Sequence, residues 1–162
     1  MRALETADGP AAIAVINTAA EWYAEFLPAA EVAEPEMSLE DWEREAGRMT
    51  WYGAFDGDQL LGVMGIEYVD DAALFRHAYV LPEHQRQGIA AELHATIERD
   101  LRGVEKIIVG TYAANYQARR ALEKGGYQLS LDPEAVLRHY YDVPEDRLRS
   151  SVTYEKQPDR DR

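Results

Sequence analysis

The segment from Gln85 to Ala90, with the sequence QRQGIA, has the residue types of an anion-binding turn. It follows an apolar stretch that ends at Leu81, and an amphipathic stretch typical of a helix begins after Gly88. The first amides of a helix have no acceptor within it, and the helix dipole adds partial positive charge there. A glycine lets a phosphate approach these amides closely, and Arg86 adds a charged donor. The pattern predicts a diphosphate-binding turn, although a single glycine at such a corner also serves plain packing.

Two side chains, His77 and Glu67, are the candidates for proton transfer. His77 lies in the expected strand before this turn, and histidine changes its protonation state near neutral pH. The alternative for His77 is a buried histidine held by hydrogen bonds for structural reasons. Glu67 ends the apolar run of a neighbouring strand, and its alternative is a charge at the solvated end of that strand. His84, His94 and His139 match no metal-binding spacing and the chain has no cysteine, so we expect no metal site and no cysteine nucleophile.

The composition is typical of one soluble domain. The chain has 162 residues, and its formal net charge of −13 opposes the clustered positive charge that nucleic acid requires. No apolar run reaches the roughly 18–20 residues of a membrane span, and Glu5 and Asp8 precede the first apolar patch, unlike in a signal peptide. Neither a P-loop nor a G-x-G-x-x-G motif is present, so nucleotide hydrolysis and dinucleotide redox lose support. We expect a cytoplasmic protein with no nucleic-acid partner and no membrane partner.

The apolar patterns predict strands and helices in the order βααβββαβαββ. Ser38 and Asp41 have the residue types of a capping box, and Gly125-Gly126 those of a helix end. Long helices between strand groups, together with a hairpin at an Asp-Gly pair, predict an α/β fold with a mixed sheet and helices on both faces. The expected strands lie near 2–6, 51–55, 59–69, 74–81, 106–112, 127–131 and 150–156, and the expected helices near 8–26, 38–49, 89–101 and 115–124, with a short helix and a loop within 132–147. The apolar stripe expected to face the core from the second helix consists of Leu39, Trp42, Ala46 and Met49.

Two motifs link the chain to a known family. The first is [QR]-x-x-G-x-[GA] between a central strand and its helix, and the second is Asn, then Ala three residues later, then a Gly-aromatic pair after the helix. These motifs are met by Gln85, Gly88 and Ala90, and by Asn115, Ala118 and Gly126-Tyr127. With them the chain resembles the GNAT superfamily of acyl-CoA-dependent N-acyltransferases. The resemblance extends over residues 1–156, taken as a single domain, and leaves 157–162 as a tail that we expect to be disordered.

The resemblance implies a particular fold and cofactor. The fold would be a mixed, mostly antiparallel central sheet in which two parallel central strands splay apart, with helices on both faces. Acetyl-CoA would be the co-substrate, its pantetheine arm pairing with the main chain at Tyr79, Val80 and Leu81. Asn115 would touch the pantetheine or the thioester. The residues that would hold the pyrophosphate are Gln85, Arg86, Gln87, Gly88, Ile89 and Ala90.

One position departs from the family pattern. Many members carry a tyrosine five residues before the aromatic of the Gly-aromatic pair, placed to protonate the leaving thiolate. Here this position is Leu122, which puts a tyrosine general acid from that site in doubt. The thiol of coenzyme A is already a fair leaving group, and Tyr112 and Tyr116 lie close in sequence as substitutes.

The sequence thus favours an N-acetyltransferase in which an amine attacks the thioester directly, with His77 or Glu67 as the catalytic base. The expected acceptor is a small, cationic amine or a protein amino group, because residues 21–45 combine aromatic side chains with carboxylates. The alternative is a GNAT-like domain that binds acyl-CoA as a sensor or scaffold without turnover, which Leu122 favours. A homodimer is compatible with either reading, since the sequence does not define the oligomeric state.

Overall fold

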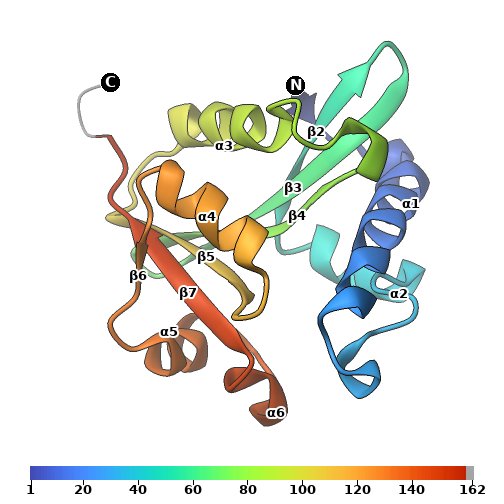
Figure 1. Ribbon diagram of the computed structural model, residues 1–162. Helices are drawn as coiled ribbons and strands as arrows, with labels where there is room; N and C mark the ends of the chain where they lie inside the picture. Colours follow the sequence, from blue (N-terminus) through green and yellow to red (C-terminus); the bar gives the residue numbers. More distant parts are fainter. Residues whose placement is uncertain (160–162) are drawn as a thin grey trace. The chain divides into compact units, whose positions relative to one another are not determined.

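The structure is a computed structural model that describes residues 1–159 (Figure 1). The chain divides into two compact units. Unit 1 consists of Met1–Glu67 and His77–Asp100, and unit 2 consists of Tyr68–Arg76 and the chain from Leu101. The last three residues of the tail predicted for 157–162 lie outside the described residues.

The strands form a seven-stranded sheet in the order β1-β2-β3-β4-β5-β7-β6. Strands β4 and β5 are parallel, whereas β1 pairs with β2, β2 with β3, and β7 with both β5 and β6 in antiparallel register. The predicted mixed, mostly antiparallel sheet is therefore confirmed. The strands are β1 Arg2–Ala3, β2 Thr50–Asp56, β3 Gln59–Val69, β4 Ala72–Val80, β5 Lys106–Tyr112, β6 Gln128–Leu129 and β7 Ser151–Lys156.

Strand β4 changes character along its length. Its parallel pairing with β5 runs from Ala72 opposite Lys106 to Phe75 opposite Val109. Two residues further on, His77 has a φ of 54°, in the left-handed region that non-glycine residues rarely adopt. Because regular pairing needs an extended backbone, His77 interrupts the course of the strand. The boundary between the two units also falls here, between Arg76 and His77.

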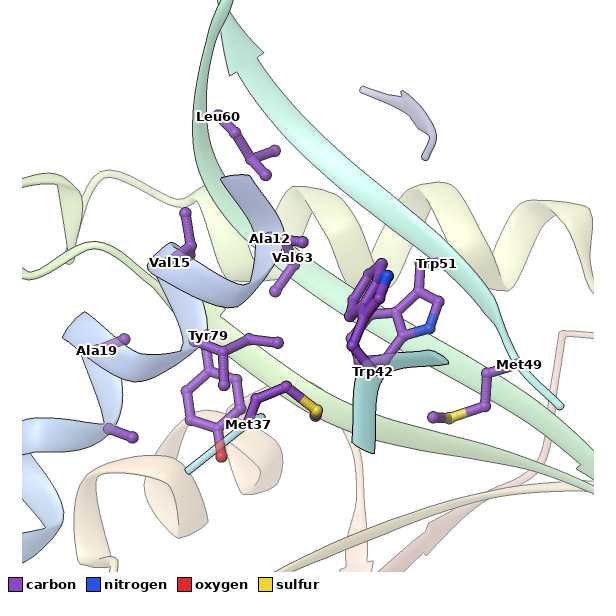
Figure 2. Packing of buried hydrophobic residues seen from close by; sticks show 12 residues of the cluster. Ala12, Val15, Ala19, Met37, Trp42, Met49, Trp51, Leu60, Val63 and Tyr79 are labelled. Atoms are coloured by element: carbon purple, nitrogen blue, oxygen red, sulfur yellow. The ribbon is translucent and has the colours of Figure 1, made fainter. Parts of the chain in front are cut away.

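Unit 1 is built on a core of aromatic and aliphatic side chains (Figure 2). Trp42 of α2 and Trp51 of β2 lie with their ring centroids 4.5 Å apart. Gly9 begins α1 and lets it approach this pair, since a Cβ there would come within 2.8 Å of the Trp42 indole nitrogen. The helices are α1 Gly9–Ala20, α2 Leu39–Ala46 and α3 Ile89–Asp100, with 3-10 turns at Thr6–Asp8, Glu21–Glu25, Ala29–Glu31 and Pro82–His84. The α-helix predicted to reach residue 26 thus ends at Ala20 and continues as a 3-10 turn.

Helix α2 begins at the predicted capping box. The amide of Asp41 donates to Ser38 Oγ at 3.0 Å, and the Asp41 carboxylate accepts from the Ser38 amide at 3.4 Å. These bonds satisfy amides that have no partner within the helix, so they fix where α2 starts and which side chains turn inward.

The predicted inward stripe of α2 is only partly correct. Trp42 and Met49 are buried, but Leu39 is 61% exposed and Ala46 is exposed. The buried line runs instead through Trp42, Glu45 and Met49. Because α2 has only eight residues and Leu39 is its first, the inward face is centred three residues later, and the charged Glu45 takes an interior place.

Unit 2 contains β5, β6, β7 and three helices. Tyr154 of β7 is fully buried, and a second apolar cluster joins Leu74 and Ile108 to Val136 of the following helix. Gly126 has a φ of 87°, so the predicted left-handed helix end is confirmed. The segment 132–147 holds two short helices where one was predicted. The helices are α4 Tyr116–Lys124, α5 Pro133–Tyr140 and α6 Glu145–Leu148.

Candidate active site

The predicted anion-binding turn in unit 1 has a backbone suited to that role. Arg86 and Gly88 have φ values of 62° and 81°, and α3 begins at Ile89. The Glu92 amide donates to the Gly88 carbonyl at 2.9 Å, so the amides from Ile89 to Ala91 precede the first helical hydrogen bond. A Cβ built on Gly88 would meet no atom within 4 Å. Unpaired amides beside a glycine that faces open space fit a diphosphate group.

Side chains of the turn hold its shape. Gln85 Nε2 donates to the Val80 carbonyl at 3.0 Å, and Gln87 Nε2 donates to the Glu83 carbonyl at 3.4 Å. Ala90 is exposed and small, so it does not obstruct the amides around it. The hydrogen bond of Gln85 joins the turn to the end of β4, and this explains why the first sequence motif has a glutamine at that position.

The main chain at the end of β4 is partly engaged within unit 1. The Leu81 amide donates to the Leu61 carbonyl, and the Leu81 carbonyl accepts from the His84 amide, both at 2.9 Å. The amide and carbonyl groups of successive residues alternate in direction along a strand. The main-chain groups of Tyr79 and Leu81 therefore point toward β3, and those of Val80 point away from it. Among the three residues predicted to pair with pantetheine, this geometry favours Val80, and the role of all three stays a prediction.

His77 is held between a carboxylate and an indole ring. Its Nε2 lies 2.6 Å from Glu45 Oε2, and the two side chains are 19% and 11% exposed. The Trp51 ring stacks on the imidazole at a centroid distance of 5.4 Å and an interplanar angle of 23°. The left-handed backbone of His77 costs about 1–2 kcal/mol for a residue with a side chain, and such strain is concentrated at functional sites.

Tyr79 continues this row of side chains along β4. Its hydroxyl accepts from the Tyr23 hydroxyl at 3.3 Å and donates to Glu36 Oε1 at 3.2 Å. Burial of the phenol raises the pKa of Tyr79 well above its ordinary value, and the nearby Tyr23 and Glu36 act in the same direction. Tyr79 is therefore a neutral hydrogen-bond donor at physiological pH.

Glu67, the second predicted base, is half-buried near the end of β3 and takes no part in the contact between His77 and Glu45. Glu45 was not among the predicted site residues. The signal that could have found it is its spacing, because it stands three residues after Trp42 on the inward side of a capped helix.

The model of the acetyltransferase (GNAT) family matches residues 16–127. The chain belongs to the GNAT acetyltransferase family. No protein of curated function matches its sequence.

Solved structures of other GNAT-type proteins share the fold. The PaiA N-acetyltransferase of Thermoplasma acidophilum in complex with coenzyme A has a TM-score of 0.73 at 18% identity, with 96% of each chain covered. An acetyltransferase of Thermus thermophilus has a TM-score of 0.70 at 18% identity, covering 96% of this chain and 94% of that one. The ribosomal-protein-S18-alanine N-acetyltransferase of Escherichia coli has a TM-score of 0.67 at 20% identity, covering 96% and 91%. At sequence identities this low, the structural similarity shows a common fold and nothing more.

The second GNAT motif lies in unit 2 and is a helix cap. Asn115 is the N-cap of α4, and its Oδ1 accepts from the Ala118 amide at 3.2 Å. The side chain is therefore fixed at the start of α4, and its amide nitrogen takes no part in the cap. Its predicted contact with the pantetheine or the thioester stays a prediction.

The GNAT tyrosine position is filled by a packing residue. Leu122 is 7% exposed on α4, among the buried residues of unit 2. Tyr116 is 66% exposed beneath the guanidinium of Arg119, and Tyr112 is half-buried. The suggestion that either tyrosine replaces the missing acid stays a prediction.

Within residues 1–159, no group of three or more His, Cys, Asp or Glu side chains could hold a metal ion. In the same part of the chain, no helix is both long and apolar enough to cross a membrane.

Proposed function

We propose that this GNAT protein is an N-acetyltransferase that transfers the acetyl group of acetyl-CoA to an amine by direct attack, with His77 as the base. The observation that carries the proposal is the setting of His77, which is strained in its backbone, paired with Glu45 and stacked on Trp51. It stands in the strand that leads into the anion-binding turn. A catalytic imidazole needs such fixed orientation, and a surface histidine does not.

Acetyl-CoA supplies the activated acyl group as a thioester. The amides of Ile89 and Ala90 and the guanidinium of Arg86 bind its diphosphate, and the Val80 amide polarises the thioester carbonyl. Asn115 holds the pantetheine arm. The matched family and the complexes of two fold relatives with coenzyme A, from Thermoplasma acidophilum and Bacillus subtilis, support this assignment.

In the reaction, His77 takes the proton that the amine loses as its nitrogen bonds to the acetyl carbon. The carbon–sulfur bond then breaks with its electron pair going to sulfur. Because Leu122 offers no acidic proton, water protonates the thiolate, and the products are the N-acetylated amine and free coenzyme A. A well-placed base contributes about 10²–10⁴-fold to the rate.

The acceptor in this proposal is a cationic amine, either a small molecule or a protein amino group. Glu36 is held beside Tyr23 and Tyr79, and Glu31 has a buried carboxylate oxygen with no hydrogen-bond donor among residues 1–159. The rings of Trp22 and Phe26, with centroids 4.9 Å apart, come from the neighbouring 3-10 turn. Carboxylates beside aromatic faces bind ammonium groups through charge and cation–π contacts.

The proposal is tested in two steps. Thermal unfolding with excess acetyl-CoA, with coenzyme A and ATP as controls, measures cofactor binding. Release of free thiol is then followed with a panel of mono- and diamines and amine-bearing peptides. Thiol release that depends on one amine class supports the enzyme. A thermal shift without release for any amine favours the alternative, an acyl-CoA sensor, for which buried Leu122 is the supporting observation. No shift at all contradicts both.

A further inference from the structure

The part of the chain that carries Glu36 has no regular structure of its own. Residues 32–37 form neither helix nor strand, since the 3-10 turn Ala29–Glu31 ends before them and α2 has its N-cap at Ser38. Such a segment has no internal ladder of hydrogen bonds, so contacts with other parts of unit 1 must fix the position of its side chains. Glu36 is a carboxylate to which the proposed function assigns the acceptor.

Asn17 of α1 supplies a contact of this kind. Its Nδ2 donates to the Met37 carbonyl at 3.0 Å, and its Oδ1 accepts from the Met37 amide at 2.8 Å. Both are good hydrogen bonds, and they join residues that lie 20 positions apart. We propose that Asn17 is a positioning residue for the acceptor, because its two bonds hold the main chain at Met37 so that Glu36 presents its carboxylate to a cationic amine. This inference rests on the proposed function, since it concerns the same acceptor site.

The pair of bonds requires the side-chain amide of asparagine. An amide carries a donor and an acceptor on one planar group, whereas a carboxylate only accepts and an aliphatic side chain does neither. Met37 is 2% exposed, so its main-chain groups are out of contact with water in this arrangement. A buried main-chain group without a partner is costly. Loss of the Asn17 amide therefore favours a different course of the segment, in which the Met37 amide and carbonyl reach water.

Glu36 also has a contact on β4, but this contact is weaker. The Tyr79 hydroxyl donates to Glu36 Oε1 at 3.2 Å, which is long for a hydrogen bond between two oxygens. Tyr79 and Met37 both belong to the core cluster of unit 1 (Figure 2). One long bond to the end of a flexible side chain restrains it little, whereas two bonds to the next residue of the main chain leave Glu36 few positions. The bonds of Asn17 therefore determine most of the placement of Glu36.

Binding of the acceptor then depends on how often the segment is held. The apparent affinity for a ligand falls in proportion to the fraction of the protein in the binding-competent arrangement. If loss of the Asn17 bonds lowers this fraction to about a tenth, the KM for the amine rises about 10-fold. Other contacts hold the rest of the site, since Trp51 stacks on His77 and Gln85 bonds to β4. Acetyl-CoA binding and kcat should therefore not change.

The first test needs no substrate. Hydrogen exchange of the Met37 amide is followed by NMR of the full chain in the wild type and in Asn17→Leu, with Thr18→Ala, at an exposed position of α1, as the control. The amide should exchange slowly in the wild type and in Thr18→Ala, and about 10-fold faster or more in Asn17→Leu. Equal rates in the wild type and in Asn17→Leu overturn the proposal.

The second test measures turnover with an amine that gives thiol release. Asn17→Leu should raise the KM for the amine about 10-fold and leave kcat and the acetyl-CoA-induced rise in Tm unchanged. A general loss of structure would lower these two quantities as well, so the split separates positioning from a structural role. In a Glu36→Gln background, Asn17→Leu should add no further rise, because a positioning residue acts only through the residue it positions. The exposed Glu34→Gln is the matched control for Glu36→Gln and should leave the effect of Asn17→Leu intact.

Two results of the second test overturn the proposal. One is an unchanged KM for the amine in Asn17→Leu, and the other is a full further rise in the double variant with Glu36→Gln. Should Asn17→Leu not fold, Asn17→Asp decides, because it has the same size, keeps the acceptor for the Met37 amide and loses the donor to the Met37 carbonyl. It should show the same split to a smaller degree, and an unchanged KM overturns the proposal.

The outcomes separate this inference from the proposed function. If the wild type releases no thiol with any amine, the proposed function fails, and the role of Asn17 at the acceptor site fails with it. If the wild type releases thiol and the Asn17 variants have an unchanged KM for the amine, only the role of Asn17 fails.

Discussion

Replacement of Gly88 by valine tests the anion-binding turn most directly. The glycine has a φ of 81°, and no atom lies within 4 Å of an added Cβ. The variant therefore has room for its side chain in the free protein and suffers mainly from backbone strain. The space that valine would fill is the space that a diphosphate needs to reach the first amides of α3.

Both effects can be given magnitudes. Left-handed backbone costs a residue with a side chain about 1–2 kcal/mol, which at this chain length corresponds to a fall of roughly 2–8 °C in Tm. Acetyl-CoA at about 100 times its Kd adds about 2.7 kcal/mol, a rise of roughly 5–11 °C in the wild type. In Gly88→Val the first effect should remain and the second should disappear.

The matched control is Gly57→Val. Gly57 lies in the β2–β3 hairpin of the same unit, has a φ of 58°, and likewise has nothing within 4 Å of an added Cβ. The assay is thermal unfolding of the wild type and both variants over a series of acetyl-CoA concentrations. Gly57→Val should lose stability but keep the ligand-induced rise. A full rise in Gly88→Val would refute the idea that this turn holds the diphosphate.

Three further predictions concern other parts of the chain. His77→Ala should lower kcat about 10²–10⁴-fold while the acetyl-CoA-induced rise in Tm persists, and normal turnover would remove His77 as the base. Leu122→Ala should lower the free energy of unfolding by about 3 kcal/mol, which corresponds to a fall of roughly 6–12 °C in Tm. The control Leu131→Ala, at a fully exposed position, should change the free energy of unfolding by no more than about 0.5 kcal/mol. Equal effects of the two substitutions would contradict a packing role for Leu122. The hydrogen bonds from Arg2 hold the pKa of Asp8 at about 2, so its ion pair stabilises the fold above pH 3.8 and this contribution is lost as pH falls through 2. In Arg2→Gln the pKa of Asp8 measured by NMR should rise toward 3.8, and an unchanged value would exclude Arg2 as the cause.

Local signals in the sequence were sufficient wherever a structural feature depends on neighbouring residues. The capping box of α2 and the glycine-terminated end of α4 were predicted correctly because each depends on hydrogen bonds or φ values within a few residues. The predicted strand 106–112 coincides with β5, since a short β-branched run between polar boundaries has few alternatives. The order of helices and strands, and the mixed sheet that it implies, were predicted from such local patterns.

Features that depend on distant residues could not be obtained in this way. Leu39 was expected inside, and Glu45 was not considered for an inward place, because the predicted stripe was built from apolar residues alone. Glu45 lies inward close to His77, which stands 32 positions later in the sequence, so no local pattern could predict this contact. The left-handed backbone of His77 has no local signal either, since it belongs to a residue type and a strand position that normally adopt extended geometry.

Acetyl-CoA would be bound mainly by main-chain groups of this fold, so the binding restricts the residue type at only a few positions. Recognition through amides and carbonyls places demands on backbone conformation, and most side chains satisfy them equally. Only positions with a conformational requirement restrict the residue type: Gly88 for its left-handed turn, Gln85 for its bond to β4, and Asn115 for its helix cap. Proteins that share the fold at TM-scores of 0.67–0.73 can therefore fall to 15–20% identity. In the proposed function, by contrast, the acceptor is selected by side chains, so replacing the carboxylates of Glu31 and Glu36 should change which amines react without changing acetyl-CoA binding.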